Sequence, residues 1–257
     1  RMARLEDAAL AKMRDRMMKS DMQQLLDIID EIDTSCKGGN EHMDYKEVLT
    51  RDVYAYAIVK ILNVQECVVF GGFVAAHISG KVWRDIDILL PKSLSTADAS
   101  RMGLRLVPFL RFLFGLTPLA IRIVNVQYNG YAQNYNLRFC IDAQLKFDIS
   151  IDFVHANTHS EFIPVSVGRC LQLTSECVTK RSMPETEVFL ASWSLDDILQ
   201  KLRAGSDVAL CCTGITPAFT QAYNAYFWKR IKDMRDTGYI IDEFIGLPPV
   251  QDETTES

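Results

Sequence analysis

The spacing of hydrophobic residues predicts helices at both ends of the chain. Residues 4–33 repeat apolar positions at near-helical spacing with Arg, Lys and Asp between them, which is typical of an amphipathic helix. A second helix is expected over residues 44–62. Near the other end, Ser194 has the form of a helix cap, and a last long helix is expected from Pro217 to about Thr237.

The segment between these helices begins with a compact series of short elements. The apolar run at 68–70 predicts a buried strand that ends at Gly71 and Gly72. A short helix is expected over residues 73–78, ending at Gly80, and then a strand over residues 84–90. In that strand the apolar Ile residues alternate with two aspartates, so the aspartates are expected to share the face that turns away from the core.

Further along, a capping box at Ser95 and Asp98 predicts a helix from Thr96 toward Leu113, and Pro108 is expected to end or kink it. Three strand-like runs follow, at 121–128, 137–143 and 145–154, and Asn129-Gly130 is a hairpin-type turn signal. The third run alternates between an apolar face and a polar face that carries two more carboxylates. The pattern at 162–173 and 177–180 is weak and indicates short strands or loops.

Composition narrows the class of protein. The chain has 257 residues, of which 48% are hydrophobic and 24% charged, as in ordinary globular domains. No apolar stretch reaches the length of a membrane span, and no secretory signal is visible near the start, so we expect no membrane partner. Seven cysteines without a C-x-x-C spacing argue against a disulfide framework and a structural zinc site, and favour a cytoplasmic location. The net charge of −5 disfavours long duplex nucleic acid as a ligand.

The candidate chemistry lies around the glycine pair. Asp85 and Asp87 are expected on one face of a strand, where two carboxylates repel each other unless a cation lies between them. Gly71 and Gly72 would let backbone N–H groups approach a phosphate without a Cβ in the way. Together these residues predict a site for a metal-bound nucleoside triphosphate. Arg84 is expected to be a solvated residue that flanks the strand.

This order of features resembles the polymerase-β-like nucleotidyltransferase superfamily. The shared pattern is a strand ending in Gly-Gly, a short helix, the run Asp85-Ile86-Asp87-Ile88, and a third acid on a later strand, over roughly residues 65–155. The resemblance implies an α/β (α+β) fold with a mixed β-sheet flanked by helices. A helical N-terminal extension is then expected at 1–43, the nucleotidyltransferase core at 44–185 and a helical C-terminal subdomain at 186–257.

The resemblance also implies an activity, the transfer of a nucleoside monophosphate from an NTP, by default ATP, to an acceptor hydroxyl with release of pyrophosphate. Asp85, Asp87 and Asp148 would be the catalytic, metal-binding residues for Mg²⁺ or Mn²⁺, and Gly71 and Gly72 would hold phosphate. The acceptor stays open between an RNA 3′ end, a protein hydroxyl and a small molecule. The alternative hypothesis is a catalytically inactive module that binds a nucleotide or a protein.

Two residue assignments have competitors. Asp148 is favoured as the third acid because residues 147–150 are similar to the corresponding segment of template-independent polynucleotide-adding members of the superfamily. Asp152 shares its face about 13 Å further along the strand, and Asp142 is a third candidate. By a looser likeness, Lys201 would bind the triphosphate, although a helix-surface pair with Asp197 explains it more simply.

Overall fold

The computed structural model describes residues 43–128, 132–155, 164–181, 183–211 and 217–246, and the helix expected at 4–33 lies outside these ranges. The helices are α3 (Met43–Val64), α4 (Gly72–Ser79), α5 (Thr96–Phe114), α6 (Pro184–Leu190), α7 (Leu195–Arg203), α8 (Pro217–Asp236) and the short 3₁₀ helix η3 (Gly168–Cys170). The strands are β1 (Val68–Phe70), β2 (Asp85–Leu89), β3 (Ile121–Tyr128), β4 (Ala132–Cys140), β5 (Lys146–Val154), β6 (Leu171–Leu173), β7 (Val178–Lys180), β8 (Ala209–Leu210) and β9 (Phe244–Ile245). None of the helices in these ranges is both long enough and apolar enough to cross a bilayer.

The predicted α+β fold class is confirmed. Seven strands form a mostly antiparallel sheet in the order β3-β4-β5-β2-β1-β6-β7, and β8 and β9 form a small parallel sheet. The contacts divide the chain into two compact units. Unit 1 holds the described residues of 1–68 and 88–156, and unit 2 those of 69–87 and 157–257. The three domains expected from the sequence stay a prediction.

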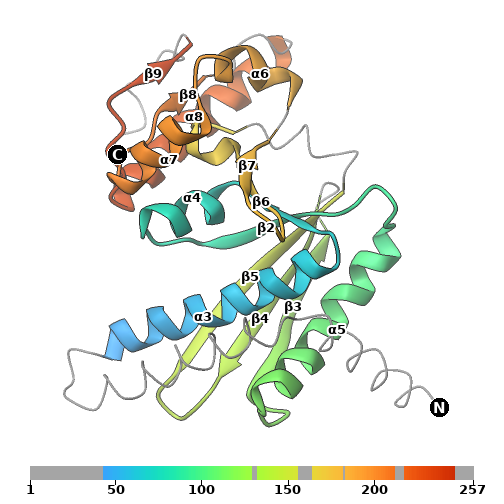
Figure 1. The fold of residues 1–257 in the computed structure, drawn as a ribbon. Helices are drawn as coiled ribbons and strands as arrows, with labels where there is room; N and C mark the ends of the chain where they lie inside the picture. The colour runs from blue at the N-terminus through green and yellow to red at the C-terminus, as the bar shows by residue number, and fades with distance from the viewer. Residues whose placement is uncertain (1–42, 129–131, 156–163, 182, 212–216, 247–257) are drawn as a thin grey trace. The chain divides into compact units, whose positions relative to one another are not determined.

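In unit 1, α3 and α5 pack on the apolar face of the meander formed by β3, β4 and β5 (Figure 1). The contact is aromatic at its centre, because the Tyr54 ring lies 4.7 Å from Phe114 and 5.0 Å from Phe139, centroid to centroid. Such tilted aromatic pairs add to the free energy gained by burying the rings. The core of this unit therefore lies between the two helices and the sheet.

The alternation predicted for β5 is confirmed, because its apolar residues are buried and its polar residues are partly exposed. The buried residues are Leu145, Phe147, Ile149, Ile151 and Phe153. The strand expected at 137–143 is instead β4, which starts earlier and ends at Cys140. It ends there because the Asp142 carboxylate accepts the N–H groups of Gln144 and Leu145, at 2.8 and 2.7 Å, and so closes a tight turn.

The capping box of α5 is confirmed, but the helix does not end at Pro108. Ser95 accepts the N–H of Asp98, whose side chain accepts the N–H of Ser95 in return. The helix runs on to Phe114 and closes at Gly115 with φ of 63°. Both Pro108 and Leu104, four residues before it, are exposed, so water can hydrate the carbonyl that proline leaves without a donor.

Unit 2 contains the segment from β1 to Asp87 and the C-terminal helices. Here α4 packs against η3, β6 and α7. The predicted capping box at Ser194 and Asp197 is confirmed at the start of α7. The last helix is also confirmed as α8, which buries Phe227, Ile231 and Met234. The sequence did not predict α6, a short helix that begins at a proline.

One close approach in unit 1 predicts an unusual response to substitution. Gly103 lies inside α5, and a Cβ added there would stand 2.5 Å from the Tyr135 ring, which is buried and packs edge-on against Phe153. Alanine normally stabilises a helix by up to about 1 kcal/mol relative to glycine. Here we expect Gly103→Ala to lower the free energy of unfolding by about 1–3 kcal/mol, measured by urea denaturation, because the ring cannot move away.

The double variant Gly103→Ala/Tyr135→Leu is the control, since it removes the ring atoms that the new methyl group would meet. Adding Gly103→Ala to the Tyr135→Leu background should cost less than adding it to the wild type. Equal costs in the two backgrounds would show that the contact between Gly103 and Tyr135 is not the cause.

Candidate functional site

The turn between β1 and α4 contains two successive glycines, and its backbone favours glycine at the first of them. Gly71 has φ of 74°, in the left-handed region that glycine adopts without strain. A Cβ on Gly71 would lie 3.2 Å from the Asp87 carboxylate, and a Cβ on Gly72 would lie 3.0 Å from the Arg169 guanidinium. The glycine pair therefore lies between an acid and a base, and a side chain at either glycine would require its neighbour to shift by a few tenths of an ångström.

The first turn of α4 suits an anion. No side chain caps this helix end, and its first turn contains no acidic residue. The N-terminal N–H groups of a helix lack intrahelical partners and attract negative charge. The approach of Arg169 to Gly72 adds a second positive group at the same place.

The two aspartates of β2 lie as the alternation predicted. Ile86 and Ile88 are fully buried, whereas Asp85 and Asp87 are half-buried on the other face of the strand. Asp87 lies against the glycine turn, and Asp85 lines a pocket together with Gly72. Trp83, just before the strand, is buried edge-on against Phe73 and so anchors this segment.

Three arginines line the pocket that contains Gly72 and Asp85. They are Arg84, Arg169 and Arg230, and the facing acids are Asp85 and Asp233. Burial lowers the pKa of Arg230, but Tyr226, Asp85 and Asp233 outweigh it and hold that pKa above its usual value. All five charged groups belong to unit 2, and they line one small pocket.

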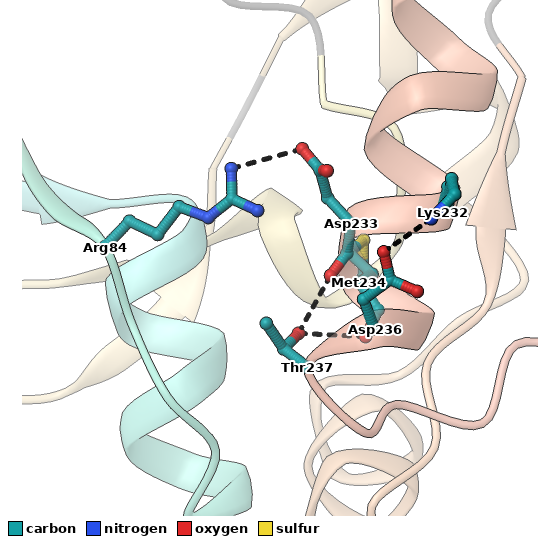
Figure 2. A network of polar contacts seen from close by, with 6 residues as sticks. All are labelled: Arg84, Lys232, Asp233, Met234, Asp236 and Thr237. Atoms are coloured by element: carbon teal, nitrogen blue, oxygen red, sulfur yellow. Dashed lines mark hydrogen bonds and ion pairs between the residues drawn. The ribbon is translucent and has the colours of Figure 1, made fainter.

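Arg84 is exposed, as expected, but it also holds an ion pair. Figure 2 shows its guanidinium reaching from the segment before β2 to Asp233 on α8, with 3.2 Å between Nη1 and Oδ2. One turn further along α8, Thr237 donates its hydroxyl hydrogen to the carbonyls of Asp233 and Met234, at 3.2 and 2.8 Å. The ion pair therefore joins the residue next to Asp85 to the C-terminal helix.

The turn that carries Arg169 is fixed by a buried acid. Asp207 is 3% exposed, and its Oδ1 accepts the N–H groups of Gly168 and Val208, both at 2.8 Å. Burial raises the pKa of Asp207, and the Gly168 hydrogen bond opposes that rise. A Cβ on Gly168 would lie 2.6 Å from Oδ2, so this position also requires glycine. Asp207 thus holds η3, and with it the backbone of Arg169, at one fixed place.

The residues at this site suit a magnesium-type ion only in part. Among the residues that the structure describes, no group of three or more His, Cys, Asp or Glu side chains is arranged to hold a metal ion. Asp85 and Asp87 nevertheless offer two hard carboxylates on one face, and Mg²⁺ usually takes one or two carboxylates and completes its shell with water and phosphate. The donor set therefore fits an ion that arrives with a phosphorylated substrate better than a permanently bound one.

Asp148 lies in unit 1 and is already paired. Arg138 on β4 faces it across the strand pair and donates from Nε and Nη2 to its two oxygens, each at 2.9 Å. This hydrogen-bonded pair holds the pKa of Asp148 below its usual value, and the nearby charges of Arg122 and Arg51 act in the same direction. The carboxylate that the sequence favoured as third acid therefore has both oxygens engaged by one arginine.

The other two candidate acids have different surroundings. Asp142 closes the turn before β5, so its carboxylate serves the backbone. Asp152 accepts a hydrogen bond of 2.6 Å from the Asn134 amide. Leu90, directly after β2, donates its N–H to Val154, which is two residues beyond Asp152 and six beyond Asp148. At about 3.3 Å per residue, Asp152 lies about 7 Å along the strand from that bond and Asp148 about 20 Å.

Lys201 lies on α7 away from the glycine pocket. Its Nζ forms an ion pair with Glu243 and lies 5.6 Å from the centre of the Trp193 ring. It lines a second pocket, formed with Trp193 and Gln200, that contains neither Gly72 nor Asp85. Asp197, the proposed helix-surface partner, is instead bound to the Ser194 cap.

Comparison with known proteins gives no assignment, because no protein-family model and no curated protein matches the chain. The geometry must therefore carry the argument. It adds Arg169 and Arg230 to the residues that the sequence singled out. Arg169 belongs to no local motif. Arg230 lies in the charged run at 229–236, which is also typical of a solvated helix face, so the sequence does not distinguish it as a binding residue.

The pairing of Asp148 predicts a measurable titration. A carboxyl whose pKa is lowered by folding contributes stability above its unfolded pKa and loses that stability as the pH falls through the folded value. In Arg138→Gln we expect the pKa of Asp148, followed by NMR, to rise toward its usual value of 3.8. The free energy of unfolding should fall only slightly at pH 7, since Arg138 is exposed and water screens the pair, and this difference should disappear in acid.

Arg101→Gln is the matched control, because Arg101 also pairs with an acid three residues away, Asp98. There the Ser95 hydrogen bonds are the main cause of the lowered pKa, so that of Asp98 should stay low. An unchanged titration of Asp148 in Arg138→Gln would contradict the pairing.

Proposed function

We propose that this protein is a metal-dependent nucleotidyltransferase that transfers a nucleoside monophosphate from an NTP to an acceptor hydroxyl. One observation carries the proposal. The strand that bears Asp85 and Asp87 lies so close to the Gly71-Gly72 turn that a Cβ on Gly71 would stand 3.2 Å from the Asp87 carboxylate. Carboxylates for a cation and a glycine turn for phosphate are thus in contact, as a metal-bound triphosphate requires.

The arginines around the pocket support a phosphorylated substrate. Arg169 lies against the first residue of α4, and Arg230 lies near Asp85. In the proposed binding mode, the helix N-terminus and Arg169 hold the outer phosphates, and Asp85 and Asp87 face the cation that accompanies them. A guanidinium can donate hydrogen bonds to two phosphate oxygens at once, so we propose Arg169 in place of Lys201 as the triphosphate ligand.

The proposed reaction is an in-line displacement at the α-phosphorus. The acceptor oxygen forms a bond to that phosphorus, the bond from it to the bridging oxygen breaks, and pyrophosphate leaves with the electron pair. A bound divalent ion would supply Lewis-acid stabilisation of the attacking and leaving oxygens. The chain's own groups position the triphosphate, and a third carboxylate takes the proton of the acceptor hydroxyl.

The surroundings of the acids favour Asp152 over Asp148 for that third role. Arg138 occupies both oxygens of Asp148, and a base so paired is weak. The preference for Asp148 came from the local sequence, and it stays a prediction that the next experiment tests directly.

Replacing the carboxylates one at a time tests the proposal. With an α-labelled NTP, Mg²⁺ and cell extract as the source of acceptor, we expect Asp85→Asn and Asp87→Asn to lower transfer by about 100-fold or more. Asp152→Asn should have a similar effect and Asp148→Asn a smaller one. The free energy of unfolding of Asp85→Asn and Asp87→Asn should change by no more than about 0.5 kcal/mol, since each change keeps the shape of the side chain.

Transfer of labelled nucleotide by Asp87→Asn at the wild-type rate would contradict the proposal. The alternative, an inactive nucleotide-binding or protein-binding module, predicts no pyrophosphate from any variant, including the wild type. Calorimetry separates its two forms. Metal-dependent NTP binding without turnover identifies a nucleotide-binding module, and the absence of any NTP signal leaves a protein-binding one.

A second pair of variants tests the phosphate ligand. Arg169→Ala should raise the KM for NTP about tenfold or more, because a hydrogen bond to a charged group contributes about 1.5–3 kcal/mol. Lys201→Ala should leave the KM unchanged, because Lys201 lines another pocket. The reverse result in steady-state kinetics would restore Lys201 as the triphosphate ligand and remove Arg169.

A further inference from the structure

The face of the β3-β4-β5 meander that points away from α3 and α5 is polar at almost every position. Strand register places one residue of each strand opposite the next, so the members of this face follow from the pairing. We call it the polar face of unit 1; its residues are Arg122, Asn125, Gln127, Asn134, Asn136, Arg138, Cys140, Lys146, Asp148, Ser150 and Asp152. The opposite face supplies the buried aromatic and aliphatic residues of the core.

Positive charge gathers at one end of this face. Arg122, Arg138 and Lys146 line a surface pocket there with Asp148 as the single acid. From α3, Arg51 approaches the same place and donates its Nε to the Asp148 carbonyl at 3.1 Å. Four cations therefore surround one carboxylate, on a chain whose net charge is −5. The local charge is opposite in sign to that of the whole protein.

The other end of the face is rich in amides. Asn125 and Gln127 on β3 and Asn134 and Asn136 on β4 lie beyond the basic pocket. Each amide both donates and accepts hydrogen bonds, as the edges of nucleic acid bases do. Ser150 and Asp152 of β5 lie directly opposite Asn136 and Asn134, and Asn134 already donates to both of them.

We propose that the polar face of unit 1 binds single-stranded RNA, with phosphates at Arg122, Arg138 and Lys146 and bases over the amide end. Three cations, one on each of the neighbouring strands β3, β4 and β5, suit a flexible chain that carries one charge per nucleotide. Asn125 and Gln127 are exposed and Asn134 and Asn136 are partly exposed, so unstacked bases can reach these amides. RNA binding by this face does not depend on the proposed function. Only the further idea that the bound RNA is the acceptor of the nucleotide rests on it, because β5 also carries the candidate third acids.

Binding is tested without turnover. The probe is a fluorescein-labelled 15-nucleotide RNA of mixed sequence, titrated with the full chain in EDTA without NTP and followed by anisotropy. Each phosphate contact contributes about −0.7 to the slope of log K against log salt for single strands, so three contacts predict a slope of about −2. In Arg122→Ala/Lys146→Ala the slope should shrink to about −0.7, and the affinity at low salt should fall on the order of tenfold.

The control variant Arg101→Ala/Arg105→Ala removes the same charge from α5, on the other side of the sheet, and should bind like the wild type. No RNA binding, or an equal loss in both double variants, would overturn the proposal. So would equal binding of a 15-residue polyglutamate, since the face would then be a general polyanion site. Because the assay contains neither metal nor NTP, a failure here leaves metal-dependent transfer intact, and a failure of transfer leaves RNA binding intact.

Discussion

The contact between the Gly71 turn and the Asp87 carboxylate is the constraint on which the candidate site depends. Gly71 has a backbone conformation that favours glycine. A Cβ added to it would lie 3.2 Å from the carboxylate of Asp87 on β2. A bulkier residue at Gly71 would push β2 away from the turn or force the backbone out of its left-handed conformation. The aspartates, the start of α4 and the approach of Arg169 all lie within one or two residues of this contact, so they form one arrangement.

The charges of the pocket in unit 2 can be understood from the same arrangement. Two carboxylates on one strand face repel each other, and the structure places Arg230 near Asp85 and Arg169 beside the turn. The Asp207 carboxylate accepts the N–H of Gly168 and so fixes η3, which carries Arg169. In the proposed binding mode, a metal-bound phosphate exchanges partners with the three arginines and two aspartates of the pocket, with little change in the total charge that is buried.

Local patterns predicted the elements, and contacts between distant residues did not follow from them. The two capping boxes, the alternation of β5 and the glycine end of α4 each depend on residues within a few positions, so the sequence was sufficient. The helix was expected to end or kink at Pro108, but it continues because water can hydrate the carbonyl that proline leaves without a donor, and the sequence does not show that exposure. Arg138 and Asp148 meet only through strand register, and Arg169 reaches Gly72 from almost a hundred residues away. Such pairs need the fold before they can be recognised.

The order of the two units along the chain has a consequence for how this protein can vary. Unit 1 is interrupted after Val68 by a short segment of unit 2, which carries the glycine turn and both aspartates, and it resumes at Ile88. The segment is therefore tied to unit 1 at both of its ends. No single cut of the gene releases either unit whole, and a recombination event that exchanges one of them must exchange two separate stretches of coding sequence.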